Sequence, residues 1–190
     1  GLVMSGGSIT GNHAKASSSS SSDYGNGGGV YANSGTKLTL SNGASIDNNT
    51  AEVYGGGVYA YSSMTLTLDG GKIQENTAKS SGGGVYVNGQ VTMTSGEISG
   101  NQSTGGYGGG IMNYGTVNIN GGTITNNTSS ENGGGIFNQK LVTMTAGTIS
   151  GNTSTNGSGG GIFSPAILKM SGGSITGNTA NSKGGGIYQG

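Results

Sequence analysis

A short glycine motif recurs at nearly constant spacing along the whole chain. Gly-Gly-Gly followed by Val or Ile occurs seven times, and successive copies are 25 to 28 residues apart. A fixed period of this length is the signature of a repeat architecture, in which each unit buries its apolar face against its neighbours. The motif therefore constrains the fold before any single residue is considered. Its β-branched residues are Val30, Val58, Val85, Ile111, Ile136, Ile162 and Ile187.

Two further patterns keep the same register. Ile-x-x-Asn also occurs seven times, and a pair of apolar residues around one polar residue, such as Leu66-Thr67-Leu68, stands between the two motifs. Although 113 of the 190 residues are Gly, Ser, Thr or Asn, a disordered chain does not hold three apolar columns in register. The repeat therefore indicates a folded chain.

Each repeat contains three short segments in which apolar and polar residues alternate. This period of two predicts strands, and the abundant glycine opposes helix. Parallel crossovers are right-handed in nearly all folds. The sequence therefore predicts an all-β, right-handed parallel β-helix of about seven coils, with three short strands and about 26 residues per coil.

The Asn of the second motif lies three residues beyond an inward Ile, at a predicted turn. A side-chain amide carries both donors and an acceptor, so stacked Asn residues can bond to their copies one coil away. We therefore predict an internal Asn ladder, with turn residues exposed to solvent as the alternative. The column consists of Asn12, Asn49, Asn76, Asn101, Asn127, Asn152 and Asn178.

The first repeat is about eleven residues longer than the others. The surplus lies at 13–26 and includes the serine tract Ser17 to Ser22, which predicts a loop extruded from the first coil. The whole chain, residues 1–190, is predicted to be a single β-helix segment with this loop as an insertion. Neither end carries a polar cap, so we expect a fragment of a longer protein, or coils that stack end to end on others.

The residue after each β-branched position is aromatic in six of the seven copies. If Val and Ile point inward, alternation turns this residue outward, about 4.8 Å from its copy in the next coil. We predict a binding stripe formed by Tyr31, Tyr59, Tyr86, Met112, Phe137, Phe163 and Tyr188. The third glycine of each motif, such as Gly57, should also face outward and leave a trough. Stacking that only stabilises the coil, or a reversed alternation that buries the rings, are the alternatives.

The paired motifs resemble a known family. Gly-Gly-Gly-Ile/Val-Tyr/Phe, as at 82–86 and 159–163, combined with Ile-Thr/Ser-Gly-Asn-Thr, as at 149–153 and 175–179, is similar to repeats of bacterial right-handed β-helix surface proteins. The polymorphic outer-membrane-protein and autotransporter-type adhesins are the nearest resemblance, although Ile here replaces their Phe and the third Gly replaces Ala. The resemblance implies a secreted or cell-surface protein that adheres to host or neighbouring cells, and it implies no catalytic residue.

Composition argues against several classes of function. Seven Lys balance seven Asp and Glu, and Arg is absent, which disfavours nucleic-acid binding. There is no Cys for a disulfide or a thiolate zinc site, and no Asp-rich calcium motif. No apolar run is long enough to span a membrane. We therefore expect no metal and no cofactor, and His13 is expected to be a loop residue without a partner.

An enzyme and an ice-binding protein are weighed against the adhesin. Asp47, Lys72, Gln74 and Glu97 share one predicted face, but they read as solvated charges rather than as a catalytic pair. Thr-x-Thr strands suit ice, but Asn118 and Lys169 interrupt them. We therefore predict a non-catalytic adhesive stalk, with glycans among its potential partners. The alternatives are a carbohydrate-binding or polysaccharide-processing β-helix and, less favoured, an ice-binding solenoid.

Overall fold

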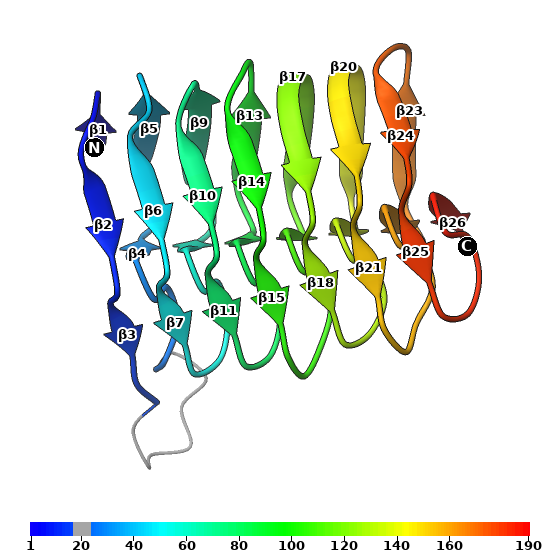
Figure 1. Ribbon diagram of the computed structural model, residues 1–190. Coiled ribbons are helices and arrows are strands. Elements are labelled where there is room, and N and C mark those ends of the chain that lie inside the picture. The colour runs from blue at the N-terminus through cyan, green and yellow to red at the C-terminus, as the bar shows by residue number, and fades with distance from the viewer. Residues whose placement is uncertain (17–23) are drawn as a thin grey trace.

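The computed structural model describes residues 1–16 and 24–190, and this part of the chain contains strands and turns but no helix. Each strand pairs in parallel with the equivalent strand one coil further on, so that Leu38 lies opposite Leu66 and Tyr59 opposite Tyr86. The coils stack into a rod whose axis runs from the N-terminal to the C-terminal end (Figure 1). The predicted parallel β-helix of about 26 residues per coil is confirmed. Within the described residues, no helix capable of crossing a membrane is found.

The largest sheet, sheet A, has 12 strands and bends sharply at one edge of the rod (Figure 1). Its first arm consists of β1 (Leu2–Met4), β5 (Lys37–Ser41), β9 (Thr65–Asp69), β13 (Gln90–Met93) and β23 (Ile167–Met170). Its second arm consists of β2 (Ser8–Thr10), β6 (Ser45–Asp47), β10 (Lys72–Gln74), β14 (Glu97–Ser99) and β24 (Ser174–Thr176). Two long strands pass through both arms, namely β17 (Thr116–Thr125) and β20 (Leu141–Ser150).

Two seven-stranded sheets complete the coil. Sheet B consists of β3 (His13–Ala14), β7 (Thr50–Ala51), β11 (Thr77–Ala78), β15 (Gln102–Ser103), β18 (Thr128–Ser129), β21 (Thr153–Ser154) and β25 (Thr179–Ala180). Sheet C consists of β4 (Val30–Ala32), β8 (Val58–Ala60), β12 (Val85–Val87), β16 (Ile111–Asn113), β19 (Ile136–Asn138), β22 (Ile162–Ser164) and β26 (Ile187–Gln189). We number the coils 1 to 7 from β1–β4 to β23–β26. They make about six complete turns between equivalent positions.

The three predicted strands of each coil correspond to the two arms of sheet A and to sheet C. Sheet B adds a fourth, two-residue strand that the repeat pattern did not predict. It follows the Asn column directly, because a left-handed residue such as Asn48 (φ 55°) turns the chain before Thr50 re-enters an extended conformation.

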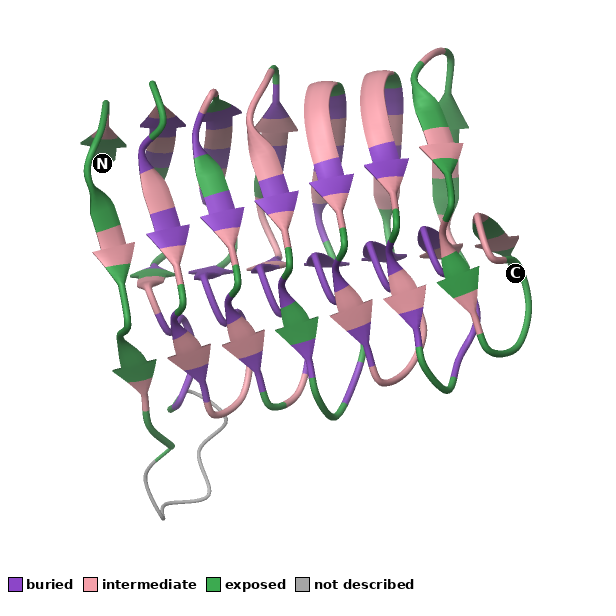
Figure 2. Cartoon of the chain, in the orientation of Figure 1, coloured by how far each residue is buried: buried purple, intermediate pink, exposed green. Residues whose placement is uncertain are grey.

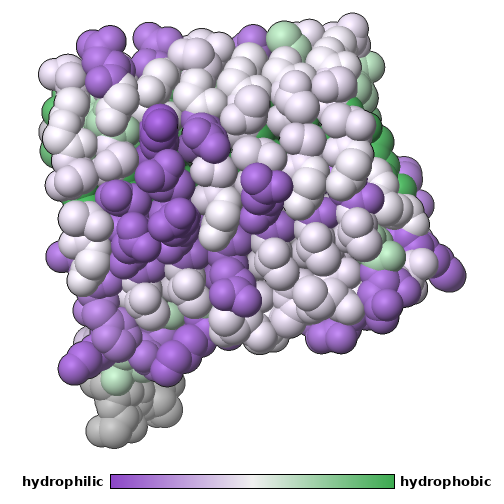
Figure 3. Space-filling view, in the orientation of Figure 1, coloured by the Kyte–Doolittle hydropathy of each residue, from purple (hydrophilic) through white to green (hydrophobic). Residues whose placement is uncertain are grey.

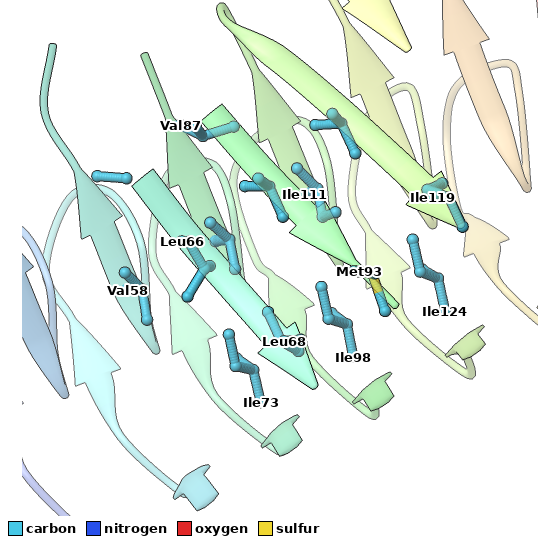
Figure 4. Packing of buried hydrophobic residues seen from close by; sticks show 14 of the residues in the cluster. Val58, Leu66, Leu68, Ile73, Val87, Met93, Ile98, Ile111, Ile119 and Ile124 are labelled. Atoms are coloured by element: carbon cyan, nitrogen blue, oxygen red, sulfur yellow. The ribbon is translucent and has the colours of Figure 1, made fainter. Parts of the chain in front are cut away.

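The core is a narrow column between the arms of sheet A and sheet C. Leu66, Leu68 and Ile73 are fully buried there, and each stacks on the equivalent residue of the next coil (Figure 4). The inward positions of both arms are therefore as predicted. Burial is complete in the middle coils and lower in the first and last (Figure 2). Each buried Leu or Ile contributes about 1.5–3 kcal/mol, so a chain with 29% hydrophobic residues can still fold.

The Asn column forms the internal ladder that the repeat predicts. Asn101 Nδ2 donates to Asn127 Oδ1 at 2.9 Å and to the Ile73 carbonyl oxygen at 2.9 Å. Its own Oδ1 accepts from both the backbone N and Nδ2 of Asn76, each at 3.0 Å. The amides from Asn49 to Asn152 thus use all of their hydrogen-bonding groups, and the ladder joins every coil to the next.

A second, shorter ladder lies inside sheet C and was not predicted. Asn113 Nδ2 donates to Asn138 Oδ1 at 2.8 Å, and Asn138 Nδ2 donates to Ser164 Oγ at 2.9 Å. All three residues are fully buried, at positions that Ala60 and Val87 occupy in earlier coils. The interior is therefore apolar on this side in coils 2 and 3 and polar in coils 4 to 6.

The structure places both ends of the predicted loop at 13–26 in the first coil. His13 and Ala14 pair with β7, and the Gly25 carbonyl oxygen accepts a hydrogen bond from Val53 N at 2.9 Å. Both ends of the range therefore belong to the first coil. The serine tract Ser17–Ser22 lies outside the described residues.

Candidate functional site

The predicted stripe lies on the outer face of sheet C. Val58 and Ala60 are fully buried in the core, whereas Tyr59 between them lies outside the core cluster on the opposite side of the strand. The same alternation holds for Met112 between Ile111 and the buried Asn113. Strand pairing puts the members of the column in register from coil to coil, since each strand of sheet C pairs with the next.

The rings of the column stack along the axis of the rod. Tyr31, Tyr59 and Tyr86 follow one another with ring centroids 5.1 Å apart. In the later coils the centroids of Phe137 and Phe163 are 5.0 Å apart, and those of Phe163 and Tyr188 are 4.9 Å apart. Met112 stands between the two stacks, opposite Tyr86 on one side and Phe137 on the other.

The column is less exposed than its position on the outer face suggests. Tyr31 is 45% exposed, but Met112 is only 2% exposed, and Tyr59 and Phe137 are also buried. The rings in the middle of the column are covered by stacked neighbours, and Tyr59, Tyr86 and Phe137 are also covered by flanking tyrosines. The middle of the stripe therefore serves as the base of a wider surface.

Four flanking tyrosines extend the column into an aromatic face. Tyr54 and Tyr107 precede the glycine motif, and each tilts over a ring of the next coil, with centroid distances of 4.7 Å to Tyr86 and 4.8 Å to Phe137. On the other flank, Tyr61 lies 6.3 Å from Tyr59, and Tyr114 lies 5.6 Å from Tyr86, again between centroids. Of the eleven aromatic residues only Tyr24 is outside this face.

The sequence also indicates two of these residues, Tyr54 and Tyr107, although neither belongs to the repeated motifs. Tyr54 and Tyr107 both directly precede Gly-Gly-Gly, where the next coil carries the smaller Ser81 or Asn132. The small residue leaves room for the tyrosine of the coil before it. Size alternation in that column could therefore have pointed to the wider face.

The glycine trough predicted beside the stripe does not exist. A Cβ on Gly57 would meet Ile73 Cγ2 and Asn76 Nδ2, both at 2.9 Å, so this glycine faces the interior and not the solvent. The alternation cannot be extended backwards from Val58, because the motif begins at Gly55 with a left-handed turn (φ 66°). The third glycine is required so that the Asn ladder can pack against the backbone of the preceding coil.

The aromatic face is almost free of charge. It comprises the stripe, the column before each glycine motif, and the column two residues after the stripe. The column before the motif is Asn26, Tyr54, Ser81, Tyr107, Asn132, Ser158 and Lys183, and the column after the stripe is Asn33, Tyr61, Asn88, Tyr114, Gln139, Pro165 and Gly190. Lys183, in the last coil, is the single ionised side chain among the described residues of these three columns. Burial raises the pKa of Tyr86 far above the ordinary value for a phenol and also raises the pKa of Tyr114.

His13 is exposed, as expected of a loop residue, but it lies in β3 and has a partner that the sequence did not indicate. His13 Nε2 lies 2.8 Å from Glu52 Oε1, and Lys79 Nζ lies 2.6 Å from Glu52 Oε2. Parallel pairing stacks these residues on the outside of sheet B in successive coils, which the sequence spacing alone did not reveal. The Lys79 ammonium, together with His13, lowers the pKa of the Glu52 carboxyl group.

The outer faces of sheets A and B are polar. They carry Thr, Ser, Asn and charged side chains, and Figure 3 shows strongly hydrophilic residues gathered over the first coils. Asp69 Oδ1 accepts from Thr94 Oγ1 at 2.8 Å and from Ser95 Oγ at 3.2 Å. Lys72 lies opposite Glu97 in neighbouring strands, but both ion pairs found among the described residues involve Glu52. In that part of the chain no three His, Cys, Asp or Glu side chains are grouped closely enough to hold a metal ion.

Fold and surface together define a parallel β-solenoid with one aromatic outer face. A family model described as the right-handed β-helix region matches residues 37–190. The chain therefore belongs to the right-handed β-helix family, and the predicted handedness is confirmed. No curated protein and no solved structure gives a significant match to the chain. β-Helix domains are common in extracellular and surface proteins and occur in enzymes as well as in non-enzymes.

Proposed function

We propose that this chain is a rigid, non-catalytic segment of a secreted or cell-surface protein, and that it acts as an adhesive stalk. The observation that carries the proposal is the aromatic face, which runs along the rod outside the core. Aromatic residues, tyrosine above all, are enriched where proteins bind partners, because they offer a large rigid contact at low entropic cost. The resemblance to autotransporter-type and polymorphic outer-membrane adhesins of bacteria supports the same role.

Rigidity follows from the way in which the coils are joined. Three sheets and the Asn ladder connect every coil to the next, so bending the rod would break hydrogen bonds on several sides at once. A β-helix lengthens by adding coils. We infer that further β-helix coils stack end to end on this segment, and that a host or neighbouring cell is the surface to which it adheres.

Two of the seven carboxylates, those of Glu52 and Asp69, support a non-catalytic role. Both oxygens of Glu52 are hydrogen bonded, and its pKa is lowered, whereas a general acid needs a raised pKa. Asp69 is similarly held by hydroxyl groups of the next coil. These acids tie neighbouring coils together on the polar faces, away from the aromatic face.

The experiment that tests the proposal replaces the exposed tyrosines Tyr61, Tyr107 and Tyr114 together with Ser. These side chains are 38–42% exposed and lie outside the core cluster, so the fold should persist, while the lost ring contacts should lower the melting temperature by several degrees. Adhesion of protein-coated beads to a panel of bacterial and animal cells should fall strongly. Equal adhesion by the variant and the unchanged protein would refute the assignment of this face.

A further inference from the structure

We infer that the ligand of the aromatic face is a neutral polysaccharide strand that lies along the axis of the rod over coils 1 to 4. This inference rests on the proposed function, because it names what occupies the same face. It depends on three properties of the face: its repetition, its lack of charge and the position of its phenol groups.

The face repeats, and a repeating face suits a repeating ligand. Tyr31, Tyr59 and Tyr86 present one ring per coil with equal centroid spacings of 5.1 Å and small interplanar angles of 13° and 16°. One pyranose unit of an extended polysaccharide is about as long as this step. A chain along the axis would therefore meet one member of the stripe in each coil and a flanking tyrosine, Tyr61 or Tyr114, in every second coil.

The face selects against charged ligands. In coils 1 to 4, the column before the glycine motif, the stripe and the column after it contain Tyr, Asn, Ser and Met but no ionised side chain. An acidic polysaccharide would lose its hydration against this surface without meeting a cation. A neutral chain of hydroxyl and ether groups has no such cost.

The exposed rings of the face are all phenols, whereas hydrocarbon and thioether groups occupy covered positions. Tyr61 is 40% and Tyr114 is 42% exposed, whereas Met112 and Phe137 are buried. A phenol combines a ring face, on which the C–H groups of a sugar can pack, with a hydroxyl that can hydrogen bond to the sugar hydroxyls. Asn33 and Asn88 alternate with Tyr61 and Tyr114 along the same flank and add amide donors and acceptors.

The open tyrosines are confined to one part of the rod. Tyr31, Tyr61, Tyr107 and Tyr114 all lie in coils 1 to 4, while coils 5 and 6 carry only phenylalanine rings on this face. Gln139 and Pro165 take the places that Tyr61 and Tyr114 hold in the earlier coils. The open tyrosines lie in coils 1, 2 and 4 and so span four coils, and the number of sugar units that contact the face should therefore be about four.

Calorimetric titration with cello-oligosaccharides of two to six units tests this inference. The association constant should rise with length up to about four units and then level off. Replacing Tyr61 and Tyr114 together with Ala should weaken cellohexaose binding at least about tenfold, the loss expected from aromatic contacts of this size. The matched control is Gln139→Ala, in the same column of coil 5, which should bind as the unchanged protein does.

Three results would overturn the inference. The first is an absence of saturable cellohexaose binding at millimolar concentrations, and the second is equal binding by the Tyr61→Ala, Tyr114→Ala variant. The third is tighter binding of hexagalacturonate, an acidic chain of the same length. Both tyrosines are exposed, so the variant should fold, and a melting curve for each variant checks this.

The same variants separate this inference from the proposed function. If cellohexaose fails to bind while cell adhesion still depends on the exposed tyrosines, the face is an adhesive surface for another partner, and only the polysaccharide inference fails. If adhesion does not depend on these tyrosines at all, the proposed function fails as well.

Discussion

Asn and Gly occupy fixed positions in the repeat for different reasons: Asn for its hydrogen-bonding groups and Gly for its small size. The ladder needs a side chain that both donates and accepts inside the core, and stacked carboxylates would repel one another at that spacing. Gly55 supplies a left-handed turn, whereas a Cβ on Gly57 would collide with Asn76 Nδ2. The two motifs of the repeat are therefore halves of one packing arrangement, in which a glycine makes room for the asparagine of the next coil.

The ladder can be tested by replacing a central asparagine. Asn101→Ala leaves the Asn76 backbone N–H and the Ile73 carbonyl without their partners in the core, so it should lower the free energy of unfolding by about 1–3 kcal/mol. Thr92→Ala, on the outer face of β13, should lower it by less than about 0.5 kcal/mol. Urea denaturation measures both, and similarly small losses would contradict the ladder.

For one buried hydroxyl group, removal is predicted to stabilise the protein rather than destabilise it. Ser103 Oγ is buried and has no hydrogen-bonding partner in the described part of the chain, whereas Ala51 and Ala78 fill the same column in coils 2 and 3. Removing an unsatisfied polar group from a core is favourable. Ser103→Ala should therefore raise the free energy of unfolding by about 1 kcal/mol in urea denaturation. The matched change Ser129→Ala removes a bond to the Glu131 carbonyl oxygen and should destabilise the protein.

The strands of sheet C combine two functions in one element. Their inward Val and Ile residues build the core, and the residues between them build the aromatic face, so the same short strand supports both stability and the proposed contact surface. Tyr59 and Phe137 are buried under neighbouring rings. The centre of the column therefore belongs structurally to the fold, and the exposed rim of Tyr61, Tyr107 and Tyr114 is available for binding.

The buried phenols of this element predict a loss of stability in alkali. Burial raises the pKa of Tyr86, so the unfolded chain releases the proton near pH 10 while the folded protein retains it. The stabilisation is complete below about pH 10 and decreases as the pH rises above it. Urea midpoints measured between about pH 8 and about pH 11 should fall less steeply for Tyr86→Phe. Tyr24→Phe, outside the aromatic face, should leave the slope unchanged, and equal slopes for both variants would contradict the account.

The insertion in the first coil should be dispensable. Deleting the nine residues 16–24 leaves Ala14-Lys15-Gly25, which matches Ala51-Glu52-Val53 in the next coil. Shortening a loop changes its closure entropy only slightly, so the thermal melt should stay cooperative, with a stability change below about 1 kcal/mol. Deleting the nine residues 95–103 instead removes β14 and β15 and should abolish the cooperative melt. Loss of cooperativity after the first deletion would show that 16–24 is part of the fold.

The elements that the sequence predicts are those with a regular period. Leu66 and Leu68 reveal their strand because alternation continues over several residues. Sheet B was missed because Thr50–Ala51 is too short to show a period, and the orientation of Gly57 was predicted wrongly because alternation ends where the chain turns. The position of the stripe could be predicted from the repeat. The burial of its rings could not, because that burial depends on tyrosines such as Tyr54 that contact a ring in another coil.

At the scale of the whole molecule, the rod presents three surfaces of different chemistry around one core. The outer faces of sheets A and B are hydroxyl-rich and carry most of the charged residues, and the net charge of the chain is zero. The outer face of sheet C gathers ten of the eleven aromatic residues. Ring stacking that stabilises the coil accounts for the buried middle of the stripe, whereas the exposed Tyr61, Tyr107 and Tyr114 support a contact surface on this side.

The most direct test compares adhesion after matched triple substitutions on each of the three faces. One variant carries Tyr61, Tyr107 and Tyr114 replaced by Ser on sheet C. The second carries Thr94, Asn120 and Thr145 replaced by Ala on or beside sheet A. The third carries Gln102, Thr104 and Thr155 replaced by Ala on or beside sheet B. All nine side chains are exposed. Adhesion of coated beads to cells should be lost only in the sheet C variant, and all three variants should keep a cooperative melt. Equal adhesion by all three variants, or a loss confined to sheet A or B, would contradict the central claim.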